Sequence, residues 1–321
     1  MRLLGVLLSI IMLIVGVLAM LFFLPKERQP LIQSQFVIDP EVFFVWDETK
    51  KLYKIEPVGL ETLHQEPFTI YFPSQYQVQA EEVAQALAQI WQVVRHRLGL
   101  DLGAFSVVLV LLREDMGGVF IESWPDKPVP LFLVSSMKWT RMSEAPQPTR
   151  LTVYAVFPHE AAHFALMWEG HWLEEGIAEY IGFRVVQELA PDLCATCREG
   201  RQKYIREILS QSTYDLTREP PQEFVVHDGV RLKVSSPEEG AGYGVSLAFW
   251  LQVAQNHGEE VIRQFLEQTR RLSQPTEHEL ARILSELTGE DIWSKLQQMN
   301  LQEALQTLEQ APCEEGQLTA P

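Results

Sequence analysis

The chain has 321 residues, of which 26 are Lys or Arg and 43 are Asp or Glu, and its net charge is −17. Proteins that bind nucleic acid usually present a basic face, and this chain has no block of Lys and Arg long enough to form one. Hydrophobic residues make up 46% of the chain and aromatic residues 10%, which excludes a disordered protein. We therefore expect a globular protein with a substantial core.

The N-terminal segment from Leu3 to Leu24 contains 22 residues without a charge. A helix of this length measures roughly 33 Å and can cross a bilayer. The alternative is a secretory signal peptide, whose apolar part usually has about 7–15 residues and ends at a small-x-small cleavage site. Because this run ends in Leu-Phe-Phe-Leu, which offers no such site, we predict a single-pass membrane anchor over residues 1–28. Its flanking charges, Arg2 before it and Lys26 and Arg28 after it, do not fix the orientation, and the cysteine spacing discussed below favours an extracytoplasmic domain.

Strands are predicted in the first half of the chain. Residues 29–65 form a mixed lead-in segment, and the main domain is expected over 66–300, followed by a C-terminal tail over 301–321. The predicted strands are Glu41–Trp46 in the lead-in, then Phe68–Phe72, Phe105–Leu112, Val119–Ile121 and Leu131–Val134. Among them, Ala80–Leu98 has the apolar spacing of a helix.

Helices are predicted in the second half. The apolar spacing predicts them over 158–168, 173–189, 199–210, 239–256, 259–272, 277–287 and 291–308. A hairpin turning at Asp228-Gly229 interrupts them. Strands followed by helices indicate an α+β fold, with an N-terminal mixed sheet and a C-terminal helical subdomain.

The cysteines allow one local pairing. Cys194 and Cys197 have a spacing that we interpret as a disulfide formed in an oxidising compartment. A redox pair and half of a metal site are the alternatives, but no second C-x-x-C is present to complete a four-cysteine site. Cys313 lies in the polar tail and receives no role.

The segment from Pro158 to Phe164 contains the motif H-E-x-x-H. On a helix, His159 and His163 share one face and can present two imidazole nitrogens to one metal ion. Glu160 follows the first ligand, where its carboxylate can act on a water molecule. A catalytic zinc requires a third protein ligand, and a carboxylate from the helix that begins near Trp172 can supply it. Glu169, His171, Glu174 and Glu175 compete for that position.

The two motifs together, H-E-x-x-H and Trp-Leu-Glu-Glu-Gly-Ile-Ala-Glu-Tyr over 172–180, resemble those of the gluzincin zinc metallopeptidases, in particular the peptidase-MA-like proteins. The resemblance implies that Glu175 is the third ligand of a single Zn²⁺. It further implies that Glu179, on the same helical face as Glu175, supports His159 from outside the ligand set. A weaker resemblance over 242–292 implies that Tyr243 stabilises the oxyanion, with Tyr204, Tyr214 and His227 as rivals.

These observations give two hypotheses. The first is a membrane-anchored zinc peptidase in which Glu160 is the general base and a peptide or protein is the substrate. The second is a membrane-anchored binding or assembly factor that keeps a metallopeptidase-like fold without catalysis.

Overall fold

The computed structural model describes residues 43–47, 52–56, 61–109, 121–122, 131–134, 139–166, 168, 172–218, 223–227, 230–234 and 236–313. The predicted membrane anchor over residues 1–28 lies outside these ranges. Within them, no helix is both long and apolar enough to cross a bilayer.

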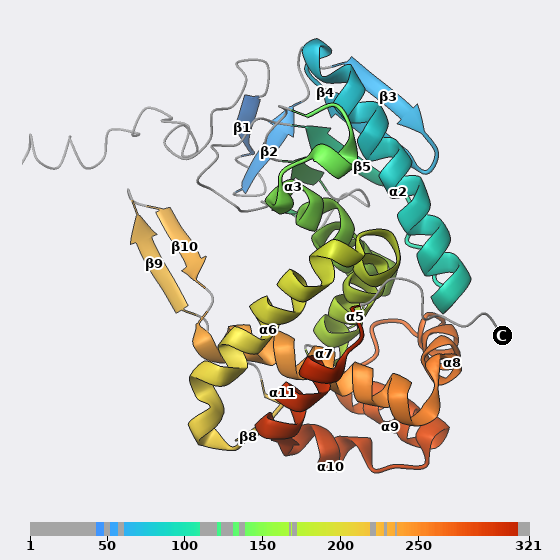
Figure 1. Cartoon of the computed structure of the whole chain (residues 1–321), viewed down its shortest axis with the longest axis vertical. Coiled ribbons are helices and arrows are strands. Elements are labelled where there is room, and N and C mark those ends of the chain that lie inside the picture. Colours follow the sequence, from blue (N-terminus) through green and yellow to red (C-terminus); the bar gives the residue numbers. More distant parts are fainter. Residues whose placement is uncertain are drawn as a thin grey trace, which may run out of the picture.

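The described residues are mostly helical with a small mixed sheet, which lies at one end of the molecule in Figure 1. The main sheet has the strand order β3-β4-β5-β7-β6, in which β4, β5 and β7 are parallel and the two edge strands are antiparallel to their neighbours. Its strands are β3 (Glu61–Gln65), β4 (Phe68–Phe72), β5 (Phe105–Leu109), β6 (Ile121–Glu122) and β7 (Leu131–Val134).

Three further strand pairs are antiparallel. They are β1 (Phe43–Asp47) with β2 (Leu52–Glu56), β9 (Glu223–His227) with β10 (Val230–Val234), and β8 (Thr213–Tyr214) with β11 (Met299–Asn300). In the β9–β10 pair His227 lies opposite Val230, so the predicted hairpin is present, although its turn residues fall outside the described ranges.

Helices form most of the remaining described residues. They are α2 (Gln77–Leu98), α3 (Gln147–Leu151), α4 (Phe157–Leu166), α5 (Trp172–Leu189), α6 (Cys194–Ile208), α7 (Pro237–His257), α8 (Glu259–Thr269), α9 (Glu277–Thr288), α10 (Ile292–Gln297) and α11 (Leu301–Gln310). A π-helical segment, Thr152–Val156, joins α3 to α4, and short 3-10 turns lie at Ser74–Tyr76, Met142–Glu144, Pro191–Leu193 and Leu209–Gln211.

The expected domain boundaries at residues 66 and 300 fall inside this packed unit. Strand β3 precedes the first boundary and pairs with β4 along its whole length. Helix α11 follows the second boundary, and its Leu301, Ala304 and Leu308 are fully buried. The helix predicted over 291–308 is interrupted because Met299–Asn300 pairs with β8, after which the Asn300 side chain accepts the first amides of α11.

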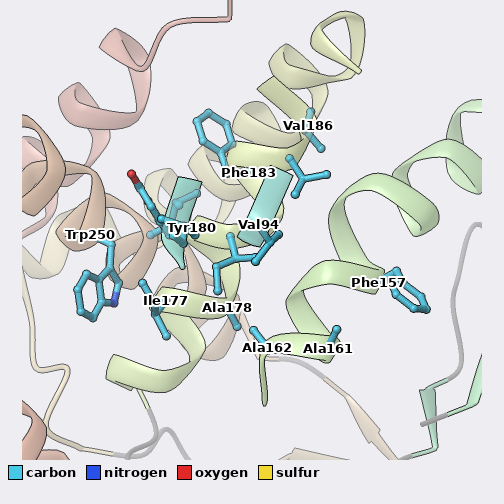
Figure 2. Packing of buried hydrophobic residues seen from close by; sticks show 14 of the residues in the cluster. Val94, Phe157, Ala161, Ala162, Ile177, Ala178, Tyr180, Phe183, Val186 and Trp250 are labelled. Carbon is cyan, nitrogen blue, oxygen red and sulfur yellow. The ribbon is translucent and has the colours of Figure 1, made fainter. Parts of the chain in front are cut away.

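The core is continuous between the sheet and the helices, with α2 packed against β4 on one side and against α5 and α8 on the other. Figure 2 shows buried residues of this core, among them Val94 of α2, Ala161 and Ala162 of α4, and Ala178 of α5. Helix α5 also passes close to the π-helical segment at Gly182. A Cβ atom there would lie 2.5 Å from the backbone oxygen of Ala155, so only glycine allows this approach. Helices α4 and α5 are therefore held together tightly, and both carry candidate site residues.

The predicted disulfide between Cys194 and Cys197 is wrong. Cys194 is bonded to Cys313, 119 residues away, and Cys197 is a free thiol. The physical reason is that both residues of the C-x-x-C lie on α6. Residues three apart on a helix have Cβ atoms about 5–6 Å apart. A disulfide requires about 3.5–4.5 Å.

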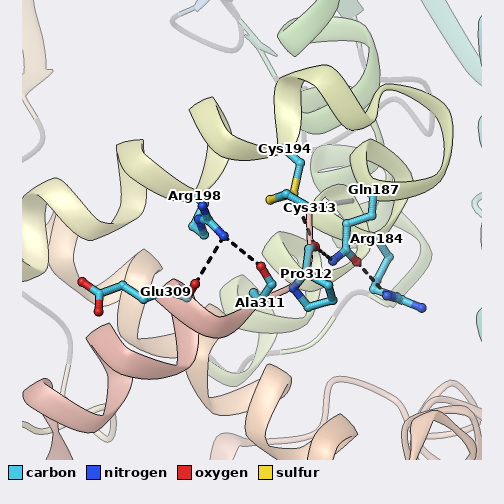
Figure 3. Close-up of a disulfide and its surroundings, with 8 residues drawn as sticks. All are labelled: Arg184, Gln187, Cys194, Arg198, Glu309, Ala311, Pro312 and Cys313. Carbon is cyan, nitrogen blue, oxygen red and sulfur yellow. Dashed lines mark hydrogen bonds between the residues drawn. A yellow bond between two sulfur atoms is a disulfide. The ribbon is translucent and has the colours of Figure 1, made fainter. Parts of the chain in front are cut away.

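Figure 3 shows what surrounds this bond. Arg198 of α6 donates to the backbone oxygen of Ala311 at 2.9 Å, and Gln187 of α5 donates to that of Pro312 at 2.6 Å. The segment after α11 is thus fastened to α5 and α6 by hydrogen bonds as well as by the covalent bond. Cys313, which received no role from the sequence, is the covalent attachment point.

Candidate metal site

The structure brings His159, His163 and Glu175 together. His159 and His163 lie four residues apart on α4, and Glu175 lies in the first turn of α5. The Nε2 atoms of the two histidines are 3.2 Å apart. Oε2 of Glu175 lies 3.4 Å from Nε2 of His159 and 3.3 Å from Nε2 of His163. The three atoms form a nearly equilateral triangle.

The size of this triangle fits a zinc ion. Ligand atoms about 2.0–2.1 Å from a tetrahedral zinc lie about 3.3 Å from one another, which is the edge that all three pairs show. Two imidazoles and one carboxylate are also a donor set that zinc prefers in catalytic sites. Oε2 of Glu175 is moreover a buried atom without a hydrogen-bond partner, which is the state of an oxygen that faces a metal position. The residues present therefore fit the predicted zinc ion.

The electrostatics of the three residues are coupled. Burial alone would lower the pKa of His159, but the carboxylates of Glu175 and Glu179 outweigh it and raise the pKa to about 9. Burial likewise opposes the shift of His163, whose pKa is raised to about 10 by Glu174 and Glu175. Burial would raise the pKa of Glu175, but the two histidines hold it well below its usual range. The three shifts thus arise from opposite charges packed closely together.

Glu179 lies beside His159. Its Oε1 is 3.3 Å from Nδ1 of His159, the ring nitrogen that points away from the metal position. Its side chain is only 9% exposed, and Arg201 of α6 holds both of its oxygens, with Nε 2.7 Å from Oε2 and Nη2 on Oε1. Although burial would raise the pKa of Glu179, Arg201 and His159 lower it. The carboxylate is therefore charged and fixed beside the ring.

Glu174 has a role that sequence reasoning missed. It competed with Glu175 as a ligand, but the structure places its Oε1 3.0 Å from Nδ1 of His163. Each histidine therefore has a carboxylate at its outer nitrogen, and such a partner fixes the ring and raises its basicity. The sequence does contain a signal for this role. Glu174 lies next to Glu175, the proposed ligand, and a histidine ligand on the neighbouring helix needs a partner for its second nitrogen.

Arg201 was also missed as part of the site. It lies on α6, which also carries Arg198, Lys203 and Arg206. Besides Glu179 it contacts Tyr243, since its guanidinium carbon is 5.4 Å from the centre of the tyrosine ring. Arg201 therefore contacts both Glu179, which lies beside His159, and Tyr243, the predicted catalytic tyrosine.

Glu160 and Tyr243, the two predicted catalytic residues, both lie near the triangle. Glu160 is half-buried beside His159 and makes no hydrogen bond or ion pair within the described part of the chain. The Tyr243 ring centre lies 6.4 Å from that of His159 and 5.6 Å from that of Trp172. Burial, followed by the charge of Glu175, raises the pKa of the Tyr243 hydroxyl, so the group remains a hydrogen-bond donor at neutral pH.

The remaining rivals either make other contacts or are not described. Glu169, His171 and the side chain of His227 lie outside the described residues. The hydroxyl of Tyr214 donates to the backbone oxygen of Glu238 at 3.0 Å, and the Tyr204 ring packs against Gly240.

Comparison with known proteins adds a likeness to solved structures. The chain matches no protein-family model and no curated protein. It is similar to native yeast LTA4 hydrolase, with a TM-score of 0.49 and 12% identity. It is also similar to yeast LTA4 hydrolase in complex with bestatin, with a TM-score of 0.48 and 14% identity. Each alignment covers 83% of this chain and 45% of that chain, so this chain spans less than half the length of those structures.

Proposed function

We propose that the chain is a zinc-dependent hydrolase of the gluzincin type that cleaves peptide bonds. The observation that supports this most directly is the triangle of His159, His163 and Glu175, whose edges of 3.2–3.4 Å fit one tetrahedral ion. A site of three protein ligands leaves the fourth position open for water or substrate, as catalytic zinc sites do. Glu160 directly follows His159 on α4 and makes no hydrogen bond or ion pair among the described residues, and a purely structural site would have no need of a carboxylate there.

Each residue then has a defined part. When bound, zinc supplies a Lewis acid that polarises a carbonyl and lowers the pKa of water. Glu160 accepts a proton from the attacking water and delivers it to the leaving amine. Tyr243 donates its hydroxyl hydrogen to the oxygen that gains negative charge. Glu174 and Glu179 hold the two imidazole rings in orientation through their outer nitrogens.

The proposal includes attachment to a membrane and an extracytoplasmic domain. The uncharged run from Leu3 to Leu24 supports the first part. The bond between Cys194 and Cys313 supports the second, because disulfides persist in oxidising compartments.

The test combines metal analysis with digestion of a mixed peptide library by the full chain. We expect one zinc ion per chain and cleavage that falls by about a hundredfold or more in Glu160→Gln, which removes the general base and leaves the ligands intact. Glu199→Gln is the matched control, since Glu199 is an exposed glutamate on α6, and it should retain full activity. Zinc binding without Glu160-dependent cleavage would instead favour the non-catalytic binding factor.

A further inference from the structure

The first turn of α5 is supported by a residue from a distant part of the chain. Oε1 of Glu277, the first residue of α9, accepts the backbone amide of Trp172 at 3.0 Å and that of Leu173 at 2.8 Å. These contacts span 105 and 104 residues of sequence. The first four amides of a helix have no partner inside the helix, so Glu277 serves two of the donors that α5 leaves open.

This support matters because of what the first turn carries. Glu175, the carboxylate of the proposed metal triangle, lies in that turn, and so does Glu174, which holds His163. Helix ends fray more readily than helix centres, so ligands placed there depend on whatever fixes the end. A negative charge at a helix N-terminus also interacts favourably with the helix dipole. Glu277 provides both the acceptor and the charge.

Helix α9 has a cap of its own that does not involve Glu277. Thr276 and Glu279 form a capping box at its start, with Glu279 Oε2 2.9 Å from the Thr276 amide. From α7, the indole of Trp250 donates to the backbone oxygen of Leu173 at 3.1 Å. Directly after Glu175, Gly176 lets α7 approach so closely that a Cβ would lie 2.7 Å from Trp250. The first turn of α5 thus contacts both α7 and α9.

From this arrangement we infer that Glu277 is a positioning residue for the metal site: by capping α5 from α9 it sets the place of Glu175 relative to the two histidines. The inference rests on the proposed zinc function, and it assigns to α9 a part in metal binding. Glu277 touches none of the ligand side chains in the described structure, so its effect passes through the backbone of α5.

The test measures the zinc dissociation constant of the full chain by competition with a chromophoric chelator, together with the melting temperature of the zinc-free protein. We expect Glu277→Ala to weaken zinc binding about tenfold, as loss of an outer support typically does. Glu277→Gln retains an acceptor oxygen without the charge, so it should weaken binding by about threefold. The matched control is Glu279→Ala, which breaks the capping box of α9 without removing an acceptor from α5.

If Glu277 only stabilised the fold, Glu277→Ala and Glu279→Ala would have the same effect on zinc binding. We expect both to lower the melting temperature of the zinc-free protein but only Glu277→Ala to weaken zinc binding. Zinc affinity of Glu277→Ala within twofold of wild type, or an equal loss in Glu279→Ala, would overturn the inference and leave the proposed function standing. Absence of zinc binding by the wild-type chain would overturn both.

Discussion

Replacing Arg201 by Met is expected to destabilise the zinc-free protein more than replacing Arg201 and Glu179 together. Arg201 forms a two-point contact with Glu179, whose side chain is 9% exposed, and no other cation in the described structure holds both of its oxygens. Breaking a buried ion pair from one side costs about 3–5 kcal/mol because the remaining charge is left without its partner. Arg201 is itself 35% exposed and Glu179 keeps its contact with His159, so the lower end, about 3 kcal/mol, applies.

The assay is thermal unfolding of the metal-free chain. A loss of about 3 kcal/mol corresponds to a fall in melting temperature of about 6–12 °C in a domain of this size. The double variant Glu179→Gln with Arg201→Met removes both charges, and a neutral pair in a buried site is often tolerated. Its melting temperature should therefore fall by no more than about half as much as that of Arg201→Met. The single variant Glu179→Gln completes the cycle and isolates the coupling between the two residues. Additive effects, with a coupling below about 0.5 kcal/mol, would refute the argument that the pair holds His159 as a unit.

Three further predictions follow from the packing and the cysteines. Gly182→Ala places a methyl group against the backbone oxygen of Ala155 and should cost about 1–3 kcal/mol in thermal unfolding. The control Gly200→Ala, with nothing within 4 Å of the new methyl, should instead stabilise α6 by up to about 1 kcal/mol. Burial raises the pKa of the Cys197 thiol to about 12 against its usual value near 9, so the reactive thiolate is scarce at pH 8 and iodoacetamide should label it only after unfolding. Rapid labelling of the native chain would contradict this placement. Cys313→Ser should lower stability by about 2–5 kcal/mol, whereas Cys197→Ser, which removes no bond, should have a much smaller effect in the same unfolding assay.

The part of the site that the sequence predicts is the part set by local spacing. His159 and His163 share a face because they lie four residues apart on one helix, and the same rule places Glu179 one turn after Glu175. The approach of Glu175 to the histidines requires two helices to pack, and the family resemblance supplied that step. Arg201 and Glu277 come from α6 and α9, and no local pattern relates either residue to the histidines.

In the fold, too, the features set by local spacing are predicted and those set by distant contacts are not. Helices with clear apolar spacing, such as α2 and α7, are predicted within a few residues of their ends. Strands β2 and β3 and the helical residues before α4 were not predicted, and the disulfide was assigned to the wrong partner. The pairing of Cys194 with Cys313 depends on where α11 ends in space, which the spacing of Cys194 and Cys197 does not encode.

The bond between Cys194 and Cys313 closes a covalent ring that contains α6 to α11. A single cut of the backbone anywhere inside this ring, for example in the exposed turn between α8 and α9, leaves one covalently connected molecule. Such a nicked chain keeps its mass on a non-reducing gel and separates into two fragments only after reduction. After any single cut, α7 with Tyr243 and α9 with Glu277 therefore remain covalently connected to α6, which carries Arg201.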